Sequence, residues 1–512
     1  MPACDDQTET IAFLSDPATY GVAGSVERID THAAIIFLAG DRAFKLKRAV
    51  RFPYLDFSTA ERRRAVCDSE LAFNRRTAPD IYLRIEPVGR LTDGSLALGS
   101  GTPVDWVVVM RRFDGACLLD SMVRQGPLPD PLVRDLADGL TAFHAQAQVV
   151  PGDGAERARR VIEGNHAAMT ALPPGLLPAA DCDRLYRSSL SALEALTPLL
   201  DRRSREGHVR HCHGDLHLAN ICLWQGRPTL FDCLEFDDAL ATTDVLYDLA
   251  FVLMDLWQRD LHGNASLLFN RYCDMRDEAD GLAALPLFLS MRAAVRAHVE
   301  ASAADRQADA EAREHKLATA RGYLAAALAF LLDRTEPSLI AVGGLSGTGK
   351  STLAAHLAPL AGSAPGARWL RSDVLRKRMA GVMPEELLPP EAYAPERSRV
   401  VYAALLEQAR QVLGTGTSVI VDAVFAKPQE REVMAGVAAA AGVPFHGLWL
   451  EAPAEIMRSR VEARHGDASD ANAAVVDRQL GYDLGDLTDW HHVDASGTPE
   501  TVLARAMAEL RR

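Results

Sequence analysis

The 512-residue sequence lacks several features, and each absence excludes a class of protein. Its eight cysteines form no Cys-x-x-Cys pair, and neither length nor composition indicates a disulfide-stapled secreted domain. No uninterrupted apolar run approaches the roughly 20 residues that span a bilayer. The N-terminal stretch MPACDDQTET lacks the basic and apolar segments of a signal peptide. These absences predict a cytoplasmic protein with reduced thiols and no membrane partner.

Charge of one sign is not concentrated anywhere along the chain. The formal net charge is −14, and the chain contains no block of like charge. This balance argues against a broad nucleic-acid or anionic-membrane surface. With 48% hydrophobic and 24% charged residues, the composition is typical of a folded globular protein. A chain of 512 residues exceeds what one hydrophobic core serves, which predicts more than one domain.

The sequence changes character at Glu336-Pro337. Before this point, a strand hairpin over 31–50, a helix over about 58–76 and a buried strand over 106–113 precede mainly helical sequence. After it, apolar strands alternate with helices, which predicts a parallel, doubly wound α/β sheet. We therefore predict one domain over 1–335, with a small lobe over about 1–113 and a large lobe over about 114–335, and a second domain over 336–512.

The second domain begins with a phosphate-binding signature. Residues 344–351, GLSGTGKS, match G-x-x-x-x-G-K-[ST] between an apolar strand and a helix. Glycines let backbone N–H groups wrap phosphates at a helix N-terminus, while Lys350 reaches the β- and γ-phosphates and the Ser351 hydroxyl ligates Mg²⁺. The predicted nucleotide-binding residues are Gly344, Ser346, Gly347, Thr348, Gly349, Lys350, Ser351 and Thr352.

Carboxylates and arginines farther along fit a kinase site. Asp422 ends the strand SVIVD and is the natural second metal carboxylate, with a structural cap as the alternative. In SDVLR, Asp373 fits a group that accepts the proton of an acceptor hydroxyl, and Arg376 fits a partner for an anionic group. A helix N-cap with a solvated arginine explains that spacing equally well.

An arginine-rich helix follows the LEAPAE segment. Arg460 and Arg464, spaced i and i+4, share a helix face and could clamp the transferring phosphate; Arg458 belongs to the same set. Surface arginines are the alternative. With GGLSGTGKST, SDVLR and SVIVDA, residues 336–512 resemble the P-loop kinases that include gluconate kinases, polynucleotide 5′-hydroxyl kinases and zeta-type toxins.

The first domain contains the histidine-rich stretch HCHGDLHLANI at residues 211–221. Asp215 precedes Asn220 by five positions, the spacing of the kinase catalytic loop in which aspartate accepts a hydroxyl proton and asparagine holds Mg²⁺. A hairpin, ICLW to TLFD, returns Asp232 to the same place as the second metal carboxylate. A zinc site on His211, Cys212, His213 and His217 is disfavoured because the stretch offers no second pair of ligands.

Such a site also needs a lysine on an upstream strand and a glutamate on a helix. Lys45 and Lys47 share one strand face, and Lys45 is preferred for the nucleotide with Lys47 the alternative. Glu70 is the preferred helix partner, since Glu61 lies where the helix begins. Solvated surface charges are the alternative for all of them. No G-x-G-x-x-G loop precedes Lys45.

The H-G-D-L-H-x-x-N pattern with its following Asp232 is similar to aminoglycoside phosphotransferases and related choline- and sugar-kinase-like enzymes. This resemblance implies a two-lobed, protein-kinase-like α+β fold and a later helix aspartate, Asp244 or Asp248, that supports the loop. Together, the two halves resemble bacterial chains described as bifunctional aminoglycoside phosphotransferase and ATP-binding proteins.

The predicted function is an ATP- and Mg²⁺-dependent phosphotransferase with two nucleotide sites, each acting on a small hydroxyl-bearing molecule such as a sugar, polyol or aminoglycoside. Two alternatives remain open at this point: a P-loop half that regulates the kinase-like half, or one that phosphorylates polynucleotide 5′-hydroxyls. The acceptors, the preference for ATP over GTP and the oligomeric state stay open.

Overall fold

The computed structural model describes residues 4–31, 33–52, 55–235, 237–463 and 466–511. The chain forms two compact units. The first contains Met1–Gly152 and Ser204–Val252, and the second contains Asp153–Arg203 and Leu253–Arg512. Helices of the predicted large lobe are thus divided between the units. This grouping does not test the domain boundary predicted at residue 335, which stays a prediction.

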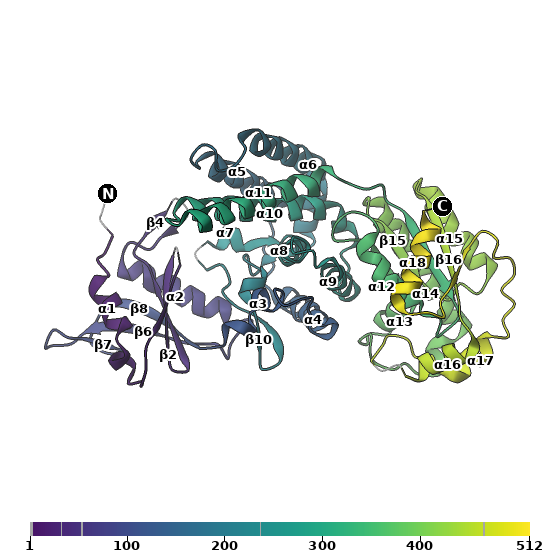
Figure 1. Ribbon diagram of the computed structural model, residues 1–512, viewed down its shortest axis with the longest axis horizontal. Coiled ribbons are helices and arrows are strands. Elements are labelled where there is room, and N and C mark those ends of the chain that lie inside the picture. Colours follow the sequence, from purple (N-terminus) through teal and green to yellow (C-terminus); the bar gives the residue numbers. More distant parts are fainter. Residues whose placement is uncertain (1–3, 32, 53–54, 236, 464–465, 512) are drawn as a thin grey trace. The chain divides into compact units, whose positions relative to one another are not determined.

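A six-stranded antiparallel sheet forms the N-terminal part of the first unit, drawn in purple and blue in Figure 1. The strand order is β1-β2-β3-β8-β6-β7. The hairpin predicted over 31–50 is confirmed, because β2 and β3 are antiparallel neighbours and place Ile36 opposite Lys45. The bounds are β1 (Glu27–Asp30), β2 (Ala34–Ala39), β3 (Arg42–Lys47), β6 (Tyr82–Arg90), β7 (Leu96–Leu98) and β8 (Thr102–Arg111), with a separate pair β4 (Arg51–Phe52) and β5 (Leu55–Asp56).

A helix packs on each face of this sheet. Alternate residues of a strand face opposite sides, so Phe37 packs with Leu14 of α1 (Thr8–Ser15). On the other face, Val108 packs with Cys67 of α2 (Ala60–Asn74), close to the helix predicted over 58–76. Helix α2 begins after Thr59, whose hydroxyl accepts a hydrogen bond from the Arg62 N–H. This packing directs one face of α2, including Glu70, toward the sheet.

The rest of the first unit carries the histidine-rich stretch. It lies between short strands and tight turns, as the sequence predicts, and β9 pairs with β12 while β10 pairs with β11. Helix α4 packs against β11, and α8 follows this segment in the chain. The bounds are η2 (Gly115–Cys117), α3 (Leu119–Met122), α4 (Asp130–Gln146), β9 (Val209–His211), η3 (Leu218–Asn220), β10 (Ile221–Trp224), β11 (Arg227–Leu230), α7 (Asp238–Ala241), β12 (Thr242–Asp244) and α8 (Val245–Trp257).

The second unit begins with a group of helices. Helices α10 and α11 run side by side (Figure 1). The stretch Ala279–Asp305 is long and apolar enough to span a membrane by length and composition, but 67% of its most apolar window is buried inside the protein. Core helices commonly have this character. The bounds are α5 (Gly154–Thr170), α6 (Ala179–Arg205), α9 (His262–Met275), η4 (Ala279–Ala284), α10 (Leu285–Asp305) and α11 (Ala310–Leu332).

The predicted parallel α/β sheet is confirmed in the same unit. Five parallel strands have the order β14-β15-β13-β16-β17, so the chain turns to opposite sides of the central strand β13 (Leu339–Gly344). Such a switch point places ligands at the carboxyl ends of the strands. The remaining bounds are α12 (Lys350–Leu357), η5 (Ala358–Leu360), β14 (Arg368–Arg371), α13 (Ser372–Met379), η6 (Pro390–Tyr393), α14 (Pro395–Gly414), β15 (Val419–Asp422), α15 (Pro428–Ala441), β16 (Phe445–Glu451), α16 (Ala454–Glu462), α17 (Ala473–Gln479), β17 (His491–Asp494) and α18 (Pro499–Leu510).

A buried ion pair fastens α2 to β8, and its loss should destabilise the first unit. The Arg63 guanidinium donates to both carboxylate oxygens of Asp105, at 2.8 and 2.9 Å, and both side chains are 1% exposed. We expect Asp105→Ala to lower the free energy of unfolding by about 3–5 kcal/mol, because it leaves a buried guanidinium without its carboxylate. Calorimetry on the full chain measures this loss.

The exposed pair Arg64–Asp68 on the same helix supplies the control. Asp68→Ala should change the free energy of unfolding by less than about 1 kcal/mol, since exposed ion pairs contribute little. Equal effects of the two substitutions would contradict the structural role of Asp105.

Candidate active sites

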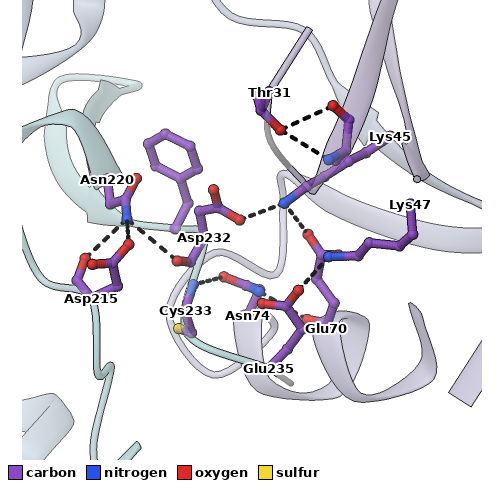
Figure 2. A network of polar contacts seen from close by, with 12 residues as sticks. Thr31, Lys45, Lys47, Glu70, Asn74, Asp215, Asn220, Asp232, Cys233 and Glu235 are labelled. Atoms are coloured by element: carbon purple, nitrogen blue, oxygen red, sulfur yellow. Dashed lines mark hydrogen bonds and ion pairs between the residues drawn. The ribbon is translucent and has the colours of Figure 1, made fainter. Parts of the chain in front are cut away.

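Two lysines of β3 converge on one carboxylate of α2 (Figure 2). The ammonium of Lys45 lies 2.7 Å from Glu70 Oε1, and the ammonium of Lys47 lies 2.7 Å from Glu70 Oε2. Lys45 also contacts Asp232 Oδ1 at 2.5 Å, whereas Lys47 contacts Glu235. The structure therefore brings together the predicted lysine, glutamate and metal carboxylate, with Lys45 as the lysine adjacent to Asp232.

Burial and neighbouring charges shift the pKa values of this cluster. Lys45, Lys47 and Glu70 are 8%, 2% and 0% exposed. Burial opposes the charged form of Glu70, but Lys45 and Lys47 outweigh it and lower the pKa of this carboxyl to about 2. Burial likewise disfavours the charged form of Lys45, yet the neighbouring carboxylates raise its pKa well above the ordinary value. The cluster is thus a set of charged groups that stabilise one another.

The backbone around Asp232 is fixed by buried side chains of the small lobe. The Asp232 N–H donates to the hydroxyl of Tyr82 at 3.2 Å, and the Cys233 N–H donates to Asn74 Oδ1 at 2.9 Å. Asn74 in turn donates to the Glu70 carbonyl, one turn earlier in α2. The same helix therefore positions both Glu70 and the chain that carries Asp232.

Asp215 and Asn220 meet as the catalytic-loop spacing predicts. The Asn220 side-chain amide donates to Asp215 Oδ2 at 3.0 Å and to the Asp215 carbonyl at 2.9 Å. It also lies 3.5 Å from the Asp232 carbonyl oxygen (Figure 2). His217 Nε2 lies 3.4 Å from Asp215 Oδ2. With its NH₂ group engaged in this way, the oxygen of the Asn220 side chain is the atom suited to a cation.

Asp248 on α8 supports this loop by accepting hydrogen bonds from its backbone. Its two carboxylate oxygens accept the N–H groups of His213 and Gly214, at 3.1 and 2.9 Å, and Oδ2 also contacts His144 Nε2 at 3.1 Å. Gly214 has a φ of +82°, and a Cβ there would lie 2.9 Å from the Leu234 side chain. Asp248, one of the two aspartates suggested by the resemblance, therefore contacts the loop.

The histidines of the stretch have different partners. His213 Nε2 donates to the Phe231 carbonyl at 3.0 Å, and burial lowers the pKa of this imidazole. Within the described parts of the chain, the group spaced for a metal ion is His144, Cys212 and Asp248 rather than the histidines of the stretch. Since both oxygens of Asp248 already accept loop N–H groups, hydrogen bonding accounts for this group.

The glycine-rich loop of the second unit has the predicted form between β13 and α12. Gly347 has a φ of +83°, and a Cβ there would lie 2.4 Å from the Met457 carbonyl oxygen, so a side chain has no room. The Ser351 hydroxyl donates to Asp422 Oδ2 at 2.5 Å. Burial raises the pKa of Asp422, against the opposing effect of Lys350 and Arg371. The predicted metal-binding hydroxyl and carboxylate are therefore together.

Among the other predicted residues of this loop, some make hydrogen bonds within the protein and one is exposed. The Lys350 ammonium donates to the Leu345 carbonyl at 3.0 Å, and Thr348 Oγ1 donates to the same oxygen at 2.8 Å. Thr352 is exposed in the first turn of α12. The Ser346 N–H donates to Gln479 Oε1 at 2.7 Å, a contact that the sequence does not indicate.

Asp373 lies in the first turn of α13, two residues after Arg371, which is in register with Asp422 of β15. Arg376 is buried and donates to the Ala392 carbonyl at 2.7 Å while its guanidinium lies over the Tyr393 ring at 4.8 Å. The structure thus brings Asp373 toward the metal carboxylate and gives Arg376 partners within the protein.

The arginines predicted near the LEAPAE segment make different contacts. Arg460 donates to the Thr348 carbonyl of the glycine-rich loop at 3.2 Å and to the Ala495 carbonyl at 2.9 Å. Arg458 forms an exposed pair with Asp477 at 2.7 Å. Arg464 lies outside the described residues. Arg460 is therefore the arginine of the predicted set that contacts the nucleotide loop.

Comparisons with known proteins agree with this division into two sites. Residues 87–285 match the model of the phosphotransferase enzyme family, and residues 339–482 match the model of an AAA domain family. Proteins of Mycobacterium tuberculosis and Mycobacterium bovis, each described as an uncharacterized protein, are 32% identical over 493 residues, which are 93% of this chain and 94% of theirs. The chain belongs to their family.

The chain joins an aminoglycoside-phosphotransferase-like domain to a P-loop kinase domain, and it is an ATP-dependent kinase. The predicted fold class, a two-lobed kinase-like domain followed by a P-loop domain, is confirmed. The kinase is therefore a phosphotransferase that acts on small molecules.

Several solved structures are similar to parts of this chain. A gluconokinase from Sinorhizobium meliloti is 21% identical, with 35% of this chain and 94% of that chain covered and a TM-score of 0.25. A choline/ethanolamine kinase family protein from Mesorhizobium loti is 16% identical, with 62% and 97% covered and a TM-score of 0.38. A thermostable mutant of an aminoglycoside phosphotransferase is 13% identical, with 61% and 98% covered and a TM-score of 0.38.

The donors in both sites of the kinase fit a magnesium ion. Magnesium prefers oxygen ligands, and the amide oxygen of Asn220 with the carboxylate of Asp232 forms such a set. In that cluster the carboxyl groups of Glu70, Asp232 and Glu235 face the two ammonium groups of β3. In the second site, the set is the Ser351 hydroxyl and the Asp422 carboxylate.

Sequence reasoning missed residues whose role depends on packing. Glu235 pairs with Lys47, and its only sequence signal is its place three residues after Asp232. Arg371 directly precedes SDVLR and pairs with Asp467 at 2.8 Å. Gln479 has no motif around it. None of these positions carries a periodic or spaced pattern that would have identified it.

The Glu70 cluster predicts a pH-dependent stability. Because the Glu70 pKa is about 2 in the folded protein, below its ordinary 4.5, its ionised form stabilises the fold. That stabilisation is fully present above pH 4.5 and is lost as the pH falls toward 2. We expect Glu70→Gln to be less stable than wild type at about pH 6, and this difference to shrink at about pH 3.

Denaturant unfolding of both proteins at the two pH values measures the difference. Glu61→Gln, an exposed position in the first turn of the same helix, is the control and should show a much smaller difference. A Glu70→Gln deficit that is equally large at both pH values would contradict the ionised cluster.

Proposed function

We propose that this kinase has two ATP sites, each of which transfers the γ-phosphate to a hydroxyl group of a small molecule of the sugar, polyol or aminoglycoside kind. The observation that carries the proposal is the contact of Lys45 with both Glu70 and Asp232, beside the Asp215–Asn220 pair. A lysine, two metal-binding side chains and a base are the parts that phosphoryl transfer to an alcohol requires.

In the first site, each side chain has a role that follows from its contacts. Asp215, half-buried beside His217, accepts the proton of the acceptor hydroxyl. Lys45, held by Glu70, binds the phosphates. Asn220 and Asp232 hold Mg²⁺, which when bound neutralises charge on the transferring phosphate. Catalysis is then mainly positioning and electrostatic stabilisation.

In the second site, the backbone of residues 344–349 and Lys350 bind the phosphates, while Ser351 and Asp422 hold Mg²⁺. Asp373 takes the acceptor proton, and Arg460 borders the nucleotide through the glycine-rich loop. Arg376 supports the acceptor side by packing on Tyr393. We further propose that the protein is cytoplasmic and that neither a membrane nor a nucleic acid is its partner.

A second candidate function makes the P-loop half a regulator of the kinase-like half. It is favoured by one contact: Gln479 accepts the Ser346 N–H, a backbone group that would otherwise bind a phosphate. A bound nucleotide would have to displace Gln479 from the Ser346 N–H. Nucleotide binding would then change the conformation around Gln479, as a regulatory domain requires. If so, Lys350→Ala would change turnover at the first site and the second site would phosphorylate no acceptor.

Asp215→Ala tests the first site. We expect transfer by this site to fall by roughly 10²–10⁴-fold, because proton acceptance is lost, while ATP still binds. The assay measures ADP release and phosphorylated product over sugars, polyols, aminoglycosides and nucleosides, in a Lys350→Ala background that silences the second site. Asp68→Ala, at an exposed position of α2, is the control. Full turnover by Asp215→Ala would refute its role as the base.

Lys350→Ala tests the second site. We expect nucleotide affinity there to fall by roughly 10–150-fold, since a charged group that binds phosphate is lost. Titration with a fluorescent ATP analogue in a Lys45→Ala background, which lacks the phosphate-binding lysine of the first site, measures it. Lys316→Ala, on α11, should leave affinity unchanged. An unaltered affinity in Lys350→Ala would show that the glycine-rich loop does not bind the nucleotide.

A further inference from the structure

The sheet of the P-loop half has an open edge at β14. This strand pairs with β15 on one side, and it is the terminal strand in the order β14-β15-β13-β16-β17. The outer edge of such a strand presents backbone N–H and C=O groups that need partners. Near β14 these groups are the Trp369 N–H and the Ala367 carbonyl.

A side chain from α9, in the kinase-like half of the sequence, satisfies both groups. Asn270 Oδ1 accepts the Trp369 N–H at 2.7 Å, and Asn270 Nδ2 donates to the Ala367 carbonyl at 3.1 Å. The amide of Asn270 thus takes the place of a neighbouring peptide group on the open edge. Asn270 is 3% exposed.

An ion pair from the same helix reinforces the contact. Arg368 Nη2 lies 2.6 Å from Asp274 Oδ1, and Arg368 Nη1 donates to Asn270 Oδ1 at 3.0 Å. Asp274 and Arg368 are 9% and 6% exposed. Arg271 of α9 also pairs with Glu385, which follows α13, at 2.8 Å.

The polar side of α9 is therefore buried, with partners in the P-loop half. Burying charged and amide side chains is costly unless each is paired, and the pairs of Asn270, Arg271 and Asp274 meet that condition. The contact between α9 and β14 is therefore a specific, buried interface and not an incidental contact between exposed surfaces.

The contact lies directly upstream of the proposed acceptor base. β14 ends at Arg371, which is in register with Asp422 of β15, and Asp373 follows two residues later in the first turn of α13. A shift of β14 therefore changes the place of Asp373 relative to the metal carboxylate. A misplacement of about 1 Å can cost on the order of 100-fold in rate.

We propose that Asn270 and Asp274 are positioning residues for the second site: helix α9 of the kinase-like half caps β14 and thereby fixes Asp373. This inference rests on the proposed function of the P-loop half for its kinetic consequence. Its structural consequence, a β14 edge held by α9, is independent of any acceptor. A helix from the first half of the sequence then supports the active site of the second half.

The test uses the full chain with Asp215→Ala, so that only the second site turns over. We expect Asn270→Ala to lower kcat of that site by about 10–100-fold while its KM for ATP stays within about twofold. Hydrogen exchange in the peptide 366–376 should become faster, because the Trp369 N–H loses its acceptor. Asp274→Asn, a milder change, should shift both readouts in the same direction.

Asn165→Ala is the matched control, since Asn165 is a buried asparagine of the second unit whose amide donates to the Met291 carbonyl, away from β14. Unchanged exchange in 366–376 for both Asn270→Ala and Asp274→Asn overturns the inference. If exchange rises but kcat is unchanged, the positioning role is refuted. If no acceptor is ever phosphorylated by the second site, the proposed function fails, and exchange alone decides whether α9 caps β14.

Discussion

The buried carboxylate of Glu70 is the constraint on which the first site depends. It is the only group in this part of the described structure that contacts both Lys45 and Lys47, and it is fully buried between a sheet and a helix. Breaking such a cluster leaves unpaired buried charges, so the sheet, α2 and the chain around Asp232 are held in one arrangement. The extra pair of Lys47 with Glu235 makes the arrangement more rigid than one lysine and one glutamate would.

In the proposed function, the two sites carry out the same chemistry with different frameworks. In the first, an antiparallel hairpin and a loop supported by Asp248 place oxygen ligands beside a lysine. In the second, the carboxyl edge of a parallel sheet places Ser351 against Asp422, and a helix N-terminus supplies backbone N–H groups. In both, oxygen atoms of the kind that bind a cation lie near positively charged groups of the kind that bind phosphate. The proximity of the groups follows from backbone geometry in each case.

Much of this was accessible from the sequence because it rests on local rules. The spacing of Asp215 and Asn220, the glycine-rich loop and the alternation of strands and helices each depend on residues close together in the chain. The hairpin between β10 and β11 explains why Asp232, 12 residues after Asn220, returns to it. The preference for Lys45 followed from pattern alone, whereas its contact with Asp232 required the fold.

Residue types and spacing in the sequence therefore determined the chemistry: which side chains could bind phosphate, hold a cation or accept a proton. Only the tertiary structure decided which of them meet. Glu235, Asp248 and Gln479 have partners that lie far away in the chain, and no periodicity connects them. The polar side of α9 is the clearest case, because a pattern typical of a solvated helix face is buried against β14. Long-range packing selects partners by shape and charge, which local spacing does not encode.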